Sequence, residues 1–173
     1  RRLGARRNRV SVLDQSSAGR LLRQQREQVS GRWQGPLAVP PGSVMLCVSL
    51  GSIPDDLAAE LLVRILRDQN VDARHISLED LQRAPPPDAS PASISMVYLV
   101  SAFPSQQRGQ ADAVAEQIRR RYPGAVLVTV FLPGMLLQPQ SAIDTIRDAD
   151  KAAPSFGEAL HIGLDWLNER NKS

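Results

Sequence analysis

The sequence predicts an α/β protein built as a three-layer sandwich, with a mainly parallel sheet between two layers of helices. Segments of strand length alternate with helical segments along the chain, and three of the strand segments are apolar nearly throughout. The helical segments carry apolar residues spaced three and four apart. A strand that is apolar on both sides is buried on both faces, which is typical of parallel sheets.

Four strands are expected. Those at residues 44–50, 94–100 and 125–132 are almost entirely apolar, whereas residues 71–76 alternate and are expected nearer the edge of the sheet. Because crossovers between parallel strands are right-handed, the simplest arrangement is a flavodoxin-like sheet of order 2-1-3-4. A fifth strand is expected to be missing or degenerate.

Helices are expected between the strands. The clearest one is capped by Ser52 and has Asp55 and Asp56 in its first turn, where carboxylates favour the positive end of the helix dipole. Its apolar residues repeat at helical spacing to about residue 69, and Asn70 ends it. The other helical segments are a short turn at 77–81, longer stretches at 104–121 and 142–149, and a last helix that begins at 154 and carries apolar residues on one face to Leu167.

Charge divides the chain into a basic arm and a mildly acidic body. The first 34 residues hold nine arginines and two acids, a net charge of +7, whereas the rest holds twelve Lys and Arg against sixteen acids, a net charge of −4. Residues 35–43 are rich in proline and glycine, as linkers are. The predicted organisation is an arm with a marginal helix at 1–34, a linker at 35–43 and an α/β domain at 44–170.

The start of the chain points toward an anionic surface. Arginine occupies five of the first nine positions: Arg1, Arg2, Arg6, Arg7 and Arg9. This composition is typical of a segment just cytoplasmic of a transmembrane helix, or of an arm on anionic lipid or nucleic acid. We therefore expect a fragment of a longer membrane protein, on the cytoplasmic side of the inner membrane. Nucleic acid is less favoured because no aromatic residues interleave the arginines.

Composition excludes several classes of protein. The single cysteine, Cys47, lies in an apolar run, so we expect a buried reduced thiol, no internal disulfide and no multi-cysteine metal site. No stretch of the sequence approaches the roughly 20 apolar residues that span a bilayer. We expect neither a metal nor a cofactor.

A ligand, if one binds, is expected at the carboxyl ends of the strands. The candidate residues at this rim are Ser52, Ser101, Ala102, Pro133 and Gly134. The rim lacks the glycine patterns GxGxxG and GxxxxGK[ST] that dinucleotide and nucleotide phosphates need. Asp55 and Asp56 in the first turn would repel a flavin phosphate, and a phospho-receiver would need an acid where Ser101 stands.

Nucleophilic catalysis is not expected either. It needs a Ser or Cys within reach of a His, and the two histidines are His75 on the second strand and His161 on the last helix. We expect both to lie away from the rim and to be structural. The chain is therefore predicted not to be an enzyme.

The stretch from Val44 to Gly134 resembles the cobalamin-binding fold, which is flavodoxin-like. The resemblance lies in the leucine-rich helix after the first strand, the sequence VYLVSAF that contains Ser101 and Ala102, and the sequence RRYPGAVLV at 120–128. The DxHxxG motif, whose His ligates cobalt in that family, is absent, and Thr129 and Val130 stand where its Gly-Gly pair would be. A degenerate domain of this kind is similar to the cytoplasmic C-terminal domains of autoinducer-2 exporter (PerM-like) permeases.

Three functions are consistent with the sequence. The first is a non-catalytic cytoplasmic domain of a bacterial membrane transport protein, with a regulatory, assembly or ligand-sensing role and a capacity to form a homo-oligomer. The second is a soluble flavodoxin-like module that binds a nucleotide or corrinoid at the rim. The third is a protein that binds nucleic acid through the arm.

Overall fold

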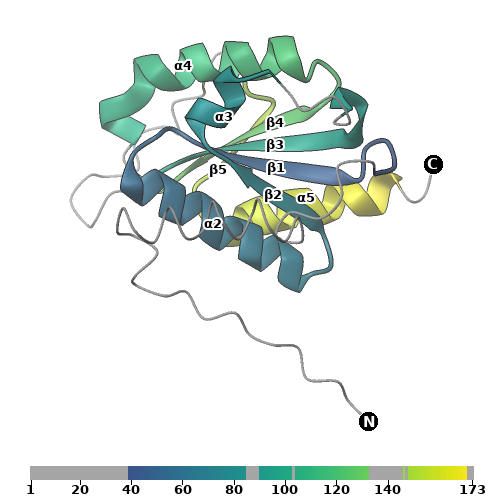
Figure 1. The fold of residues 1–173 in the computed structure, drawn as a ribbon. Coiled ribbons are helices and arrows are strands. Elements are labelled where there is room, and N and C mark those ends of the chain that lie inside the picture. The colour runs from purple at the N-terminus through teal and green to yellow at the C-terminus, as the bar shows by residue number, and fades with distance from the viewer. Residues whose placement is uncertain (1–38, 85–89, 103, 133–145, 147, 171–173) are drawn as a thin grey trace, which may run out of the picture. The chain divides into compact units, whose positions relative to one another are not determined.

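A five-stranded parallel sheet lies between two layers of helices in the computed structural model, which describes residues 39–84, 90–102, 104–132, 146 and 148–170 (Figure 1). Every neighbouring pair of strands is parallel, and the strand order is β2-β1-β3-β4-β5. The strands are β1 (Val44–Ser49), β2 (Asp72–Ile76), β3 (Ile94–Ser101), β4 (Val126–Phe131) and β5 (Lys151–Ala153). The predicted flavodoxin-like α/β fold and its 2-1-3-4 order are confirmed.

The fifth strand is the one element of the sheet that the sequence did not locate. β5 has three residues, which pair in register with Val128, Thr129 and Val130 of β4. A segment this short, with a lysine and two alanines, has neither the length nor the β-branched residues that mark a strand. Its pairing depends on β4, which presents an otherwise free edge.

The helices divide between the two faces of the sheet. On one face lie α2 (Ile53–Asp68) and α5 (Phe156–Arg170), and on the other lie α3 (Leu78–Gln82) and α4 (Pro104–Arg121) (Figure 1). A short 3-10 turn, Pro91–Ser93, precedes β3. Ser52 and Ser77 cap α2 and α3 as expected, and Asn70 takes a φ of 61° just beyond the end of α2.

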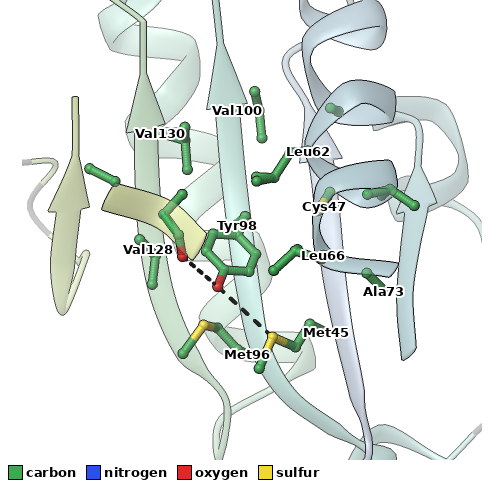
Figure 2. Close-up of a cluster of buried hydrophobic side chains, with 14 of the residues drawn as sticks. Met45, Cys47, Leu62, Leu66, Ala73, Met96, Tyr98, Val100, Val128 and Val130 are labelled. Atoms are coloured by element: carbon green, nitrogen blue, oxygen red, sulfur yellow. Dashed lines mark hydrogen bonds between the residues drawn. The ribbon is translucent and has the colours of Figure 1, made fainter. Parts of the chain in front are cut away.

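The core has one layer on each face of the sheet. Side chains of β1, β3 and β4 alternate between the layers, and Figure 2 shows those that face α2 and α5, among them Cys47, Tyr98 and Val128. Cys47 is fully buried and is a free thiol. Burial raises the pKa of this thiol far above its ordinary value, although the positive charge of Arg67 opposes the shift.

An arginine of α4 fixes the end of the sheet where β4 begins. Arg119 donates to the backbone carbonyl of Ala125 at 2.9 Å and to that of Asp148 at 2.8 and 3.0 Å. It also contacts the carboxylate of Asp150, which accepts a hydrogen bond from the N–H of Leu127 at 2.7 Å. Burial alone would raise the pKa of Asp150, but these hydrogen bonds outweigh it and lower the pKa.

Several predicted features lie outside the described residues. These are the arm at 1–34 with its arginines, the linker up to residue 38, and residues 142–145 and 147 of the helix expected at 142–149, whose described residues 146, 148 and 149 are not helical. Residues 39–43, at the end of the expected linker, form a turn in which Gly42 has a φ of 65° and Ser43 N–H donates to the carbonyl of Pro40. Among the described helices, none has the length and apolar character needed to cross a bilayer.

Candidate functional site

The rim expected to hold a ligand lies where β1 and β3 end. β1 has β2 on one side and β3 on the other, so the chain leaves β1 and β3 toward opposite faces of the sheet. In open parallel sheets this switch point is where ligands bind, commonly with an anionic group at a helix N-terminus. Here that N-terminus belongs to α2, which follows β1 after the turn at Gly51 and Ser52.

A carboxylate of the protein itself occupies this switch point. Asp55, in the first turn of α2, is fully buried. Its Oδ1 accepts a hydrogen bond from the backbone N–H of Ala102, just beyond β3, at 2.8 Å. Its Oδ2 accepts one from the N–H of Ser52 at 3.2 Å, and Ser52 Oγ accepts one from the N–H of Asp55 in return. Asp55 therefore caps α2 and ties the ends of β1 and β3 together.

Other polar groups at this rim are also engaged with one another. The carbonyl of Leu50, just after β1, accepts a hydrogen bond of 2.9 Å from the side-chain amide of Gln110 in α4. Gly51 follows with a φ of 94°, a conformation that L side chains rarely adopt. The turn that joins β1 to α2 is thus held by α4 on one side and by its own capping box on the other.

Beside the switch point, three polar side chains form a chain of contacts between β1, α2 and β2. Ser49 Oγ donates a hydrogen bond of 2.5 Å to Asp56 Oδ1, and His75 Nε2 lies 3.8 Å from the same oxygen. The side chains of Asp56 and His75 are 30% and 11% exposed, whereas Ser49 is fully buried. The expectation that His75 lies away from the rim is therefore wrong, because its side chain reaches the first turn of α2.

The order of these three groups does not suit nucleophilic catalysis. A serine nucleophile needs an imidazole that accepts its proton, with the carboxylate on the far side of the imidazole. Here the carboxylate of Asp56 stands between Ser49 and His75, and Ser49 has no exposed surface. The arrangement fixes the start of α2 against the two strands.

The structure places three of the five rim residues predicted from the sequence. Ser52, Ser101 and Ala102 are brought together at the ends of β1 and β3. Ser52 and the N–H of Ala102 are both engaged by Asp55, and Ser101 is fully buried. Pro133 and Gly134 lie outside the described residues, as do Arg1, Arg2, Arg6, Arg7 and Arg9.

Two functional features escaped the sequence analysis. Asp55 was expected only at the start of a helix, but it also binds Ala102, 47 positions further along the chain. A bond over that separation leaves no local pattern. The proximity of His75 had a usable signal, since it is the fourth of five residues in β2, near the carboxyl end where the rim lies.

Within the part of the chain that the structure describes, no group of three or more His, Cys, Asp or Glu side chains is placed to hold a metal ion. Comparisons with family models, curated proteins and solved structures find no match to this chain.

Proposed function

We propose that this chain is a non-catalytic regulatory or assembly domain on the cytoplasmic side of a bacterial membrane transport protein. The observation that carries the non-catalytic part is the bond between Asp55 and Ala102. A nucleotide phosphate or another anionic group would need the N–H of Ala102 and the N-terminus of α2, and the carboxylate of Asp55 already uses both.

This observation also weighs against a nucleotide or corrinoid at the rim. A ligand there would have to displace a buried carboxylate that accepts two hydrogen bonds, one from the N–H of Ser52 and one from the N–H of Ala102. Leaving the buried side chain of Asp55 without these partners would cost about 1–3 kcal/mol or more. Binding energy would first have to offset that cost.

The membrane part of the proposal comes from the composition of the arm. Five arginines in the first nine residues suit an anionic bilayer surface, where each basic residue contributes about 1 kcal/mol of attraction. The resemblance to the cytoplasmic domains of PerM-like permeases points the same way. The body carries a net negative charge, so the arm is the part expected to make the contact.

Two measurements on the full chain test the proposal. Native mass spectrometry should show the polypeptide without a bound small molecule, and a retained nucleotide or corrinoid mass would contradict the proposal. Cosedimentation should show binding to vesicles that contain phosphatidylglycerol and not to pure phosphatidylcholine. Changing Arg1, Arg2, Arg6, Arg7 and Arg9 to Ser should abolish this binding.

A matched control separates the arm from general positive charge. Arg83 and Arg120 are exposed on the body, with 61% and 76% of their side chains accessible. Changing both to Ser should leave vesicle binding nearly unchanged. If the chain instead prefers double-stranded DNA over the anionic vesicles at the same salt concentration, the arm serves nucleic acid and the membrane proposal fails.

A further inference from the structure

The outer surface of α2 carries an apolar stripe that the core does not use. Among the described residues, the large hydrophobic side chains that are exposed are Ile53 and Leu61, 52% and 37% accessible, and both lie on this helix. Leu57 stands between them and Ile65 follows, both only partly buried. The core face of α2 is made of other residues: Ala58, Ala59, Leu62, Val63 and Leu66.

The spacing of this stripe suits packing against another helix. Ile53, Leu57, Leu61 and Ile65 are each four positions apart, so they form one of the inclined ridges along which helices interdigitate. Glu60 and Arg64 precede Leu61 and Ile65 by one position and therefore lie along one side of the ridge.

We propose that this stripe is the contact between two copies of the chain, with the two α2 helices crossing antiparallel about a two-fold axis at a height along α2 between Leu61 and Leu62. Leu61 is midway in sequence between Leu57 and Ile65, and Leu62 is midway between Glu60 and Arg64. An axis at this position brings Glu60 of each copy opposite Arg64 of the other, on the same side of the contact. On the opposite side it brings Leu61 beside its own copy and Leu57 beside Ile65. The pattern is self-complementary in charge and in apolar residues, as an isologous contact requires.

The contact is small, so we expect the two copies to associate weakly. A single helix pair buries less than the roughly 1,200 Å² typical of a stable complex. The full chain should therefore associate reversibly, with a dimer that grows across the micromolar to millimolar range in sedimentation velocity.

Three variants test the contact. Leu61→Glu should weaken association at least tenfold, because it places two carboxylates beside each other across the axis. Ala113→Glu on the exposed surface of α4 is the matched control and should leave association unchanged. Circular dichroism melts of each variant separate a lost contact from a lost fold.

Charge reversal distinguishes a direct contact between two copies from a change in the stability of the fold. Arg64→Glu and Glu60→Arg should each weaken self-association, because both reciprocal pairs become like-charged. Mixing the two variants should restore a dimer, now a heterodimer, because opposite charges face each other again at both positions.

Three outcomes would overturn the proposal. The first is a chain that stays monomeric over the whole concentration range. The second is a dimer that Leu61→Glu leaves intact, since another surface would then form it. The third is a monomeric chain in which Leu61→Glu removes binding to anionic vesicles, since the stripe would then be a lipid contact.

Discussion

Gly163 of α5 lies directly against the hydroxyl group of Tyr98 in β3. A Cβ atom built on Gly163 would be 2.4 Å from Tyr98 Oη, closer than real Cβ contacts come. The hydroxyl is fixed there because it donates a hydrogen bond of 3.0 Å to the carbonyl of Ala159, one turn earlier in α5 (Figure 2). Burial of this phenol raises its pKa far above the ordinary value, so it stays a neutral donor.

Gly163→Ala is therefore expected to destabilise the protein by about 1–3 kcal/mol, as overpacking does. The effect should shrink when Tyr98→Phe removes the oxygen that the methyl group would meet, and a double-mutant cycle in urea measures this coupling. Gly157→Ala in the same helix is the control, since its nearest neighbour atom would be 3.8 Å away. A Gly163→Ala variant as stable as the wild type would show that α5 can shift.

The two capping boxes of this fold allow the bond between Asp55 and Ala102 to be measured on its own. Asp55 and Asp80 each close a capping box with the serine three positions earlier, but Asp80 is exposed and its hydrogen bonds stay within the segment from Ser77 to Arg83. Asp55→Ala should lower the free energy of unfolding by about 2–3 kcal/mol, and Asp80→Ala by about 1 kcal/mol. Equal losses in urea unfolding would mean that the hydrogen bond from Ala102 to Asp55 adds nothing to the free energy of unfolding.

Cys47 should react with thiol reagents only when the protein unfolds. The thiolate is the reactive form, and burial holds the pKa of Cys47 far above neutral. At pH 8, labelling with a disulfide reagent should be slow in buffer and should reach one thiol per chain in denaturant. Adding Ala113→Cys on the exposed surface of α4 supplies a fast internal standard. Rapid labelling of Cys47 in buffer would show that the sheet opens locally.

Asp150 should contribute stability that acid removes. Its pKa is lowered in the folded protein, so the contribution is present above the ordinary aspartate pKa of about 3.9 and is lost as pH falls through the folded value. Asp150→Asn should cost about 1 kcal/mol or less at pH 7, because the carboxylate is partly exposed and its pair with Arg119 is screened. The difference from wild type should shrink as the pH falls toward 3.

Urea unfolding at pH 7, 5 and 3 measures this dependence. Glu116→Gln is the control, because the pair of Glu116 with Arg120 is exposed and lies within one helix. A gap between Asp150→Asn and wild type that stays constant down to pH 3 would contradict an ionised Asp150 as its source.

The sequence by itself determined the fold class, because it depends on local patterns. The apolar runs of β1, β3 and β4, the alternation of β2 and the capping serines at 52 and 77 each report on a few neighbouring residues, and together they specify a parallel sheet between helices. β5 escaped because its three residues form a strand only by pairing with β4.

The tertiary structure alone decided what the rim contains. Sequence placed Ser52, Ser101 and Ala102 near one another, since parallel strands end at one edge, but it could not show that Asp55 fills the space between them. Nor could it show that His75 approaches Asp56, or that Tyr98 requires a glycine 65 positions later. Each of these contacts joins segments that are distant in the chain, and their distances are set by how the helices pack on the sheet rather than by any local preference.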